Sequence, residues 1–331
     1  MWSFSIDSDS GVMVRDVQIN TRKGGEPVKI IQMTDLHLNY CTDEELKNPT
    51  LAGTWQNRVW QKVQRDGEGA YRNVNPKNFS IRNMESCIRY IDREKPDQLV
   101  ITGDIFDYLS EGNALLAKSY IFDRYPTALA CLGNHEVVQQ MQGDVAESLS
   151  LADRMAALEG IWRHDIHYVS KVLGDKVMLV VMDNCRGGRY GSFSWTQEKK
   201  LRTDLAEARE KGYTVILFYH IPLATENPAY RSTCAEEYVK GDAGTAVWDF
   251  QTKGICSSAE DEATVAVYKL ITSNADVIAA AFCGHKHNDY VTEINATDAV
   301  GERRVIPQYI LIGTVYGGSS IKGNVLRITV N

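Results

Sequence analysis

The feature that most constrains the fold is a short apolar run that ends abruptly in a polar residue and recurs along the chain. Six such runs lie at residues 28–34, 98–102, 128–132, 177–182, 215–219 and 277–283. Each has the length of a β-strand and is rich in apolar or β-branched side chains, which is typical of strands buried on both faces. All are far too short to span a bilayer, which takes about 20 apolar residues.

Helical patterns lie between these runs. Apolar side chains at positions 81, 84, 88 and 91 are spaced to share one face of a helix. Ser194 and Gln197 have the spacing of a capping box, which predicts that a helix begins there. The alternation of strands and helices indicates a layered α/β fold. Residues 304–313 and 324–330 have the pattern of strands with no helix between them, so we expect mixed sheets.

Composition excludes some classes of protein. The 331 residues carry 43 acidic and 36 basic side chains, a formal charge of −7, which argues against bulk electrostatic binding of nucleic acid. A hydrophobic content of 44% is ample for a packed core, so a disordered chain is excluded. No N-terminal stretch has the pattern of a signal peptide, so we expect a cytoplasmic protein. A secreted form whose signal has been removed would look the same.

Two long polar stretches interrupt the alternation, at residues 38–78 and 224–262. Both contain tryptophan and tyrosine, and loops of this length within a compact domain are usually functional or separately folded. We interpret both as insertions near the mouth of a site. Surface decorations that pack on the core are an equally good explanation.

Side chains that can bind a metal ion follow five of the six runs. They are Asp35, His37, Asp104, Asp107, Asn134, His135, His220, His285 and His287. Ligands of open α/β sheets bind beyond the carboxyl ends of the strands, so we expect these side chains to converge. Carboxylates and imidazoles together suit first-row ions such as Mn, Fe, Zn or Co. One ion takes about four to six donors, so the set suffices for two ions that share a carboxylate.

The local backbone is expected to aim these groups. Asp35 and His37, and likewise His285 and His287, are two residues apart and would face the same way on an extended backbone. The glycines at positions 103, 133 and 284 would allow the sharp turns that present the neighbouring ligands.

Five sequence blocks in this order resemble the calcineurin-like metallophosphoesterases. The blocks are Asp35-Leu-His37, Gly103-Asp104-Ile-Phe-Asp107, Gly133-Asn134-His135-Glu136, His220 and Gly284-His285-Lys-His287, and the resemblance covers about residues 28–325. Residues 218–223 and 284–290 resemble the purple-acid-phosphatase-like branch. True purple acid phosphatases have a tyrosine ligand in place of Asp107 and a glycine in place of His37, so the purple colour is not expected here.

The resemblance implies a fold and a chemistry. It implies one domain over residues 1–331 with the two insertions, built as a four-layer α/β/β/α sandwich of two mixed sheets flanked by helices. Asp35, His37, Asp104 and His287 would hold one metal ion, and Asp104, Asn134, His220 and His285 a second. A hydroxide between two Mn, Fe or Zn ions would attack a phosphoester. His135 would be the general acid, and Asp107 would orient it through a hydrogen bond.

The function implied by this chemistry is that of a metal-dependent phosphatase or phosphodiesterase acting on a small molecule. One alternative is a non-catalytic binding or scaffold protein on the same fold, but such relatives usually lose ligands, and none is lost here. A nuclease is the other alternative. It would need a basic track along the cleft, and neither insertion supplies a clear one, so nucleic acid is not the expected partner. The substrate, the metal pair and the oligomeric state are not predicted.

Several candidates also have a purely structural explanation. Asp107 could cap the following helix. Asp183 and Asn184 end a strand near the site, where loop hydrogen bonding explains them best. Glu136 is expected to support its loop rather than to react. His164 and His167 match no block, and we interpret them as surface or partly buried residues.

Overall fold

The computed structural model describes most of the chain. The described ranges are residues 2–38, 79–107, 109–137, 158–185, 192–223, 262–315 and 321–331, with isolated positions at 40, 42, 44, 47, 155 and 156. The two predicted insertions, at 38–78 and 224–262, lie almost wholly outside these residues. No helix among the described residues is long and apolar enough to cross a membrane.

Within the described residues, twelve strands form two six-stranded sheets, both mixed. The first sheet has the order β1-β2-β12-β3-β4-β5, and the second has the order β10-β11-β9-β8-β7-β6. The strands are β1 (Ser3–Ile6), β2 (Met13–Ile19), β3 (Val28–Met33), β4 (Gln98–Thr102), β5 (Leu129–Cys131), β6 (Tyr168–Leu173), β7 (Val177–Met182), β8 (Thr214–Phe218), β9 (Ile278–Cys283), β10 (Tyr290–Thr297), β11 (Arg303–Ile310) and β12 (Asn324–Val330).

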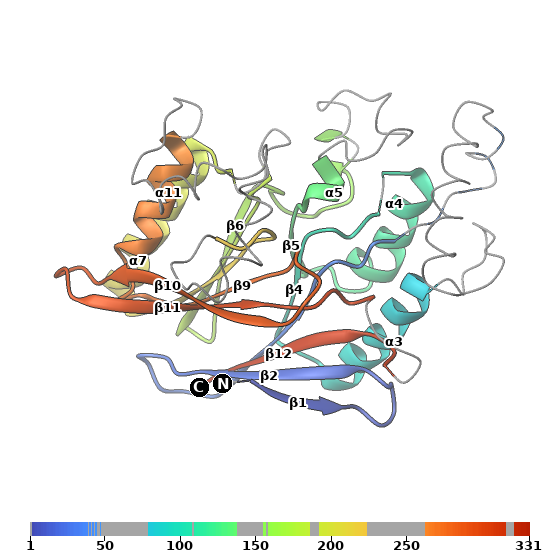
Figure 1. Cartoon of the computed structure of the whole chain (residues 1–331), viewed down its shortest axis with the longest axis horizontal. Helices are drawn as coiled ribbons and strands as arrows, with labels where there is room; N and C mark the ends of the chain where they lie inside the picture. Colours follow the sequence, from blue (N-terminus) through green and yellow to red (C-terminus); the bar gives the residue numbers. More distant parts are fainter. Residues whose placement is uncertain are drawn as a thin grey trace.

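Helices lie on the outer sides of the two sheets (Figure 1), so the predicted α/β/β/α sandwich is confirmed. The helices are α3 (Phe79–Glu94), α4 (Glu111–Ala117), η1 (Lys118–Phe122), α5 (Asn134–Val137), α7 (Trp195–Lys211) and α11 (Glu262–Thr272). The capping box of α7 forms as predicted, because the Ser194 hydroxyl accepts from the Gln197 amide and the Gln197 side chain accepts from the Ser194 amide.

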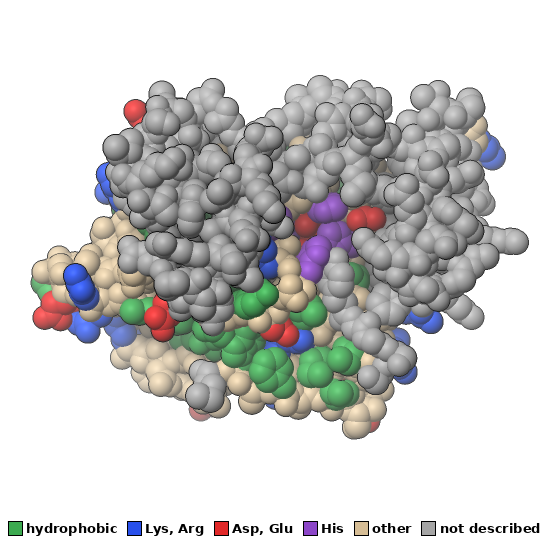
Figure 2. All heavy atoms as spheres, in the orientation of Figure 1, with side chains coloured by type: hydrophobic (Ala, Val, Ile, Leu, Met, Phe, Trp, Pro, Cys, Tyr) green, Lys and Arg blue, Asp and Glu red, His purple; other side chains and the backbone are tan. Residues whose placement is uncertain are grey.

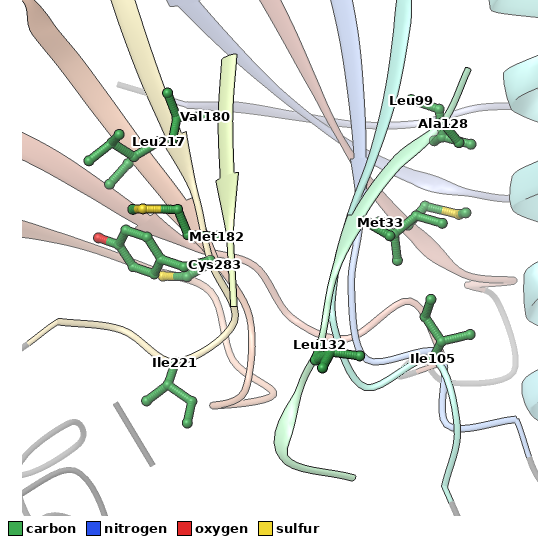
Figure 3. Packing of buried hydrophobic residues seen from close by; sticks show 14 of the residues in the cluster. Met33, Leu99, Ile105, Ala128, Leu132, Val180, Met182, Leu217, Ile221 and Cys283 are labelled. Carbon is green, nitrogen blue, oxygen red and sulfur yellow. The ribbon is translucent and has the colours of Figure 1, made fainter. Parts of the chain in front are cut away.

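Alternation along the central strands explains why their sequences are apolar throughout. In β7, Val177, Leu179 and Val181 belong to the core between the sheets, whereas Met178 and Val180 belong to the core beneath the helices. Figure 3 shows side chains of the second kind on both sheets, pointing away from each other. Because both faces of these strands are covered, both faces are mainly apolar.

The strands that carry the candidate ligands run parallel. Pairs β3–β4 and β4–β5 are parallel in the first sheet, and β8–β9 in the second. Their carboxyl ends therefore lie at one edge of each sheet, as the position of a ligand site in an α/β fold requires.

Candidate metal centre

The predicted ligands come from both sheets and meet where the carboxyl ends of the strands converge. His220 follows β8, and its ring Nδ1 donates to the carbonyl of Thr102 on β4, at 2.7 Å. The His285 amide, after β9, donates to the two carboxylate oxygens of Asp35 at 3.2 and 3.1 Å. Histidine and acidic side chains lie side by side on the face seen in Figure 2. The two sheets thus contribute to one polar cluster.

A first group of ligand atoms comes from Asp35, His37, Asp104 and His287, all within 4.8 Å of one another. The Nε2 atom of His287 lies 3.0 Å from Asp35 Oδ1 and 3.1 Å from His37 Nε2. His37 Nε2 lies 4.0 Å from Asp104 Oδ2. Four donors of this kind and spacing suit a first-row divalent ion.

A second group shares Asp104 with the first. Asp104, His220 and His285 again offer atoms within 4.8 Å of one another. His220 Nε2 lies 3.1 Å from Asp104 Oδ2 and 3.0 Å from Asn134 Oδ1, and His285 Nδ1 lies 2.8 Å from the same Asn134 oxygen. All seven predicted metal ligands are therefore brought together, in two groups joined by one carboxylate.

The burial and the charges of these donors fit a pair of metal ions. Asp35 and Asp104 are at most 1% exposed. Burial alone would raise the pKa of Asp35, but hydrogen bonds from His287 and His37 hold that pKa well below its usual range. Burial would lower the pKa of His220, yet the Asp104 carboxylate raises it to about 10. The cluster thus draws positive charge toward its carboxylates, as a cation site does.

The backbone aims the ligands in a way the sequence analysis did not foresee. Seven non-glycine residues among those described have positive φ, and five of them are candidate ligands. These five are Asp35 (φ 50°), His37 (φ 43°), Asp104 (φ 50°), His285 (φ 70°) and His287 (φ 53°). The expectation that the two ligand pairs lie on extended backbone is therefore wrong. Left-handed backbone costs of order 1–3 kcal/mol per residue and gathers at functional sites.

The positions beside these candidate ligands require glycine for two different reasons. Gly103 has φ 79°, so it supplies a turn as predicted. Gly133 and Gly284 do not have positive φ, and they are needed for close approach instead. A Cβ on Gly284 would lie 2.0 Å from Thr34 Oγ1 and 2.3 Å from Asp35 Oδ2. A Cβ on Gly133 would lie 2.2 Å from Asp104 Oδ1.

Two ligand-bearing loops of the first sheet are joined main chain to main chain. The amides of Asp35 and His37 donate to the carbonyls of Gly103 and Asp104 at 3.1 and 3.0 Å, and that of Leu38 donates to Ile105 at 2.8 Å. This short ladder continues the parallel pairing of β3 and β4 past the ends of the strands. It explains how left-handed residues can be held in place without regular secondary structure.

The hydrogen bond between His135 and Asp107 is made by the main chain of Asp107. His135 Nδ1 donates to the main-chain carbonyl of Asp107 at 2.9 Å, whereas the Asp107 carboxylate oxygen is 3.9 Å away. That carboxylate lies nearer to His37, at 3.4 Å from Nδ1. Asp107 therefore orients His135 through its carbonyl group. Because a carbonyl only accepts, the proton sits on Nδ1 and the other ring nitrogen, Nε2, is left for chemistry.

Glu136 supports its loop, as expected. Its buried carboxylate accepts main-chain N–H groups from Gly133 at 2.6 Å, Asp104 at 3.0 Å and Phe106 at 2.9 Å. Burial, together with the neighbouring Asp104 charge, raises the pKa of Glu136 to about 7. This one side chain ties the turn before Asn134 to the loop after β4.

Two buried carboxamides hold the segment after β8, and each bonds both main-chain groups of one residue. Asn184 accepts from the Ile221 amide at 3.0 Å and donates to the Ile221 carbonyl at 2.7 Å. Gln308 accepts from the Leu223 amide at 2.8 Å and donates to its carbonyl at 3.0 Å. Asn184 was recognisable as a strand-end polar residue, and its expected loop bonding is confirmed. Gln308 lies within β11 and carried no such signal.

The remaining polar residues near this edge have structural partners. Asp183 accepts from the Cys185 amide at 2.6 Å and lies 2.9 Å from His167 Nδ1. That hydrogen bond with Asp183 raises the pKa of His167. The Nε2 atom of His164 accepts the Ala130 amide at 3.0 Å. Neither histidine belongs to the groups of candidate ligands.

A family model identifies the family of the chain. The calcineurin-like phosphoesterase family model matches residues 28–289. No curated protein matches the chain. The chain belongs to this family, because the match covers well over half of the sequence.

Several solved structures resemble the chain at low identity. A dimetal phosphatase from Danio rerio is 14% identical, covering 88% of this chain and 89% of that one, with a TM-score of 0.40. A purple acid phosphatase from yellow lupin (Lupinus luteus) seeds is 12% identical, covering 92% and 44%, with a TM-score of 0.43. A putative 5'-nucleotidase from Staphylococcus aureus is 12% identical, covering 89% and 56%, with a TM-score of 0.38. The chain thus spans less than two thirds of the last two proteins.

Proposed function

Because the chain belongs to the calcineurin-like phosphoesterase family, we propose that it is a metal-dependent hydrolase of small-molecule phosphoesters. The observation that carries the proposal is the pair of donor groups that share Asp104, with His135 beside them. A scaffold protein on this fold would have no need to keep seven buried or half-buried donors, five of them on left-handed backbone.

The two donor groups suit two ions such as Mn, Fe or Zn. Asp35, His37, Asp104 and His287 would hold one, and Asp104, Asn134, His220 and His285 the other, with Asp104 between them. When bound, two adjacent cations make a water molecule more acidic and neutralise charge on the phosphoryl oxygens.

His135 is proposed as the general acid. Its amide donates to Asp104 Oδ1 at 2.8 Å, and its Nε2 lies 4.0 Å from Asp104 Oδ2, so the ring faces the shared carboxylate. The Asp107 carbonyl fixes the ring by accepting from Nδ1. A proton on Nε2 would pass to the leaving oxygen of the ester, after which His135 is neutral and recovers a proton from solvent. Burial lowers the pKa of His135, which favours release of that proton.

A metal-reconstitution assay tests the function. Chelated protein should hydrolyse neither p-nitrophenyl phosphate nor its bis ester, and Mn²⁺ or another divalent ion should restore activity toward at least one. His135→Asn should reduce turnover by about 100-fold or more, because general acid catalysis contributes that much. Elemental analysis should find the metal content of this variant unchanged.

A matched variant separates the two roles. Asp104→Asn should lose metal as well as activity, because the shared carboxylate belongs to both donor groups. Loss of metal from the His135 variant would instead show that His135 is a ligand. Wild-type protein with metal bound and no activity toward either ester would support the scaffold alternative. A wider panel of phosphoesters would then identify the substrate class.

A further inference from the structure

The candidate centre has an anchor outside the residues that match the family. Arg15 lies on β2, before the matched segment that begins at residue 28, and only 4% of it is exposed. Its guanidinium donates to Asp289 through Nε at 2.8 Å and through Nη2 at 2.6 Å. Asp289 is two residues beyond His287. A two-point ion pair of this kind fixes orientation as well as distance.

The same guanidinium is linked indirectly to the loop that carries Asp35. Arg15 Nη1 donates to Asn324 Oδ1 at 2.9 Å, and Asn324 in turn donates to the Gly313 carbonyl at 3.1 Å. Asp289 Oδ1 also accepts the Ile312 amide at 3.0 Å. The next residue after Gly313, Thr314, donates its amide to the carbonyl of Thr34, at 2.8 Å. Arg15 is therefore bonded, through short chains of contacts, to the segments beside both His287 and Asp35.

Burial fixes the geometry of this hydrogen-bond network. Phe4 of the edge strand β1 lies over the guanidinium, with its ring centroid 5.8 Å from Cζ. The Asp289 side chain is 22% exposed, so the pair is shielded on most sides. A charge pair removed from water is screened little and costs free energy if one partner is removed.

We propose that Arg15 is a positioning residue for the metal centre, acting through Asp289 on the loop that carries His285 and His287. The inference rests on the proposed function and extends it to the β1–β2 hairpin. The left-handed backbone of His285 and His287 gives the anchor its purpose, since strained residues keep their geometry only when the surrounding structure holds them.

The test measures metal affinity rather than activity alone. Mn²⁺ titrations by calorimetry on chelated protein should show about tenfold weaker binding to Arg15→Met and to Asp289→Asn, the range seen when groups that orient ligands are removed. The double variant should be no weaker than either single variant, because the two residues act as a unit. Saturating Mn²⁺ should largely rescue turnover. Arg15→Lys, which keeps the charge but not the two-point contact, should lie between.

Arg327→Met is the matched control. Arg327 lies on β12 in the same sheet and pairs with Asp16 at 2.5 Å and Glu94 at 3.3 Å, with no contact to Asp289 among the described ion pairs. Its loss should lower the melting temperature but leave Mn²⁺ affinity within about twofold. Arg15 and Asp289 variants that behave like this control would overturn the inference while leaving the proposed function intact. Wild-type protein that neither binds Mn²⁺ nor hydrolyses either ester would overturn both. If Arg15→Met does not fold, Arg15→Lys and Asp289→Asn carry the test.

Discussion

The two halves of the candidate centre are held by opposite kinds of side chain. In the first sheet, the Glu136 carboxylate accepts three main-chain N–H groups from two loops. In the second sheet, the carboxamides of Asn184 and Gln308 each bond one N–H and one C=O of a single residue. The first half is gathered around an acceptor, and the second half is held as a neighbouring strand would hold it.

The difference arises from the main-chain groups that each segment has left to bond. Around Gly133 and Asp104 the chain turns sharply, so several N–H groups point inward together and only an acceptor with two oxygens satisfies them. Ile221 and Leu223, which follow β8, each offer one donor and one acceptor to a single carboxamide. A carboxylate and a carboxamide of equal size are therefore not interchangeable at either place.

Removing Glu136 should be the most damaging change to this arrangement. Glu136→Ala leaves three buried N–H donors without their acceptor, each costing about 1–3 kcal/mol, so the free energy of unfolding should fall by at least about 3 kcal/mol. Glu136→Gln keeps one oxygen and should cost less. Urea denaturation of the chelated proteins measures both. Equal losses would show that the acceptor pattern is not what the site needs.

Gly284→Ala tests how closely the two halves of the candidate centre approach each other. The added methyl group would overlap Thr34 and Asp35, so we expect a loss of about 1–3 kcal/mol and displacement of the neighbouring ligand His285. Gly24→Ala is the control, because a Cβ there meets no described atom within 4 Å. The same measurements, with metal content added, compare the two. A Gly284 variant as stable as the control would mean that the halves approach less closely than described.

The mirror of the Glu136→Gln exchange is Asn184→Asp. The new carboxylate cannot donate to the Ile221 carbonyl, so stability should fall by about 1–3 kcal/mol. Gln308→Glu should behave alike toward Leu223. Thermal unfolding would check both. If the acidic variants match the wild type while Glu136→Gln does not, the second half is held by packing rather than by its carboxamides.

The smallest expected effect concerns the charge beside Asn184. A hydrogen bond with Asp183, the residue before Asn184, raises the pKa of His167, so protonated His167 stabilises the fold. This contribution is fully present below the unfolded pKa of about 6.5 and is lost as pH rises through the higher folded pKa. Unfolding measurements on His167→Gln between about pH 5.5 and 8.5 should show its deficit shrinking, from less than about 1 kcal/mol because the side chain is half-exposed. A deficit that grows with pH would contradict the assignment.

The sequence was sufficient to locate the main strands and the candidate ligands that the structure brings together. All six apolar runs form strands because burial on both faces leaves an unmistakable pattern, and each ligand lies directly after a strand end. Strands β1 and β2 were not predicted. Strand β1 lies at the edge of the sheet, where Phe4 and Ile6 are more than half exposed, and the polar residues Arg15, Asp16 and Gln18 interrupt the apolar residues of β2, so no apolar run marks either strand.

The supports of the site were harder to predict than the site itself. Arg15 and Asp289 are 274 positions apart, and nothing local to either indicates the other. Gln308 lies within a strand, and its role in holding Leu223 is evident only from the hydrogen bond between them. The left-handed ligands also escaped, because the local residue types allow but do not require positive φ. Local patterns locate ligands, whereas long-range contacts fix their geometry.

The hydrogen bonds of Asn184 and Gln308 also separate His220 from the chain after Leu223. Each carboxamide bonds both main-chain groups of one residue, so the segment that follows His220 is held at Ile221 and at Leu223. A change in the sequence after residue 223 therefore reaches His220 only through two residues whose main-chain groups are already bonded.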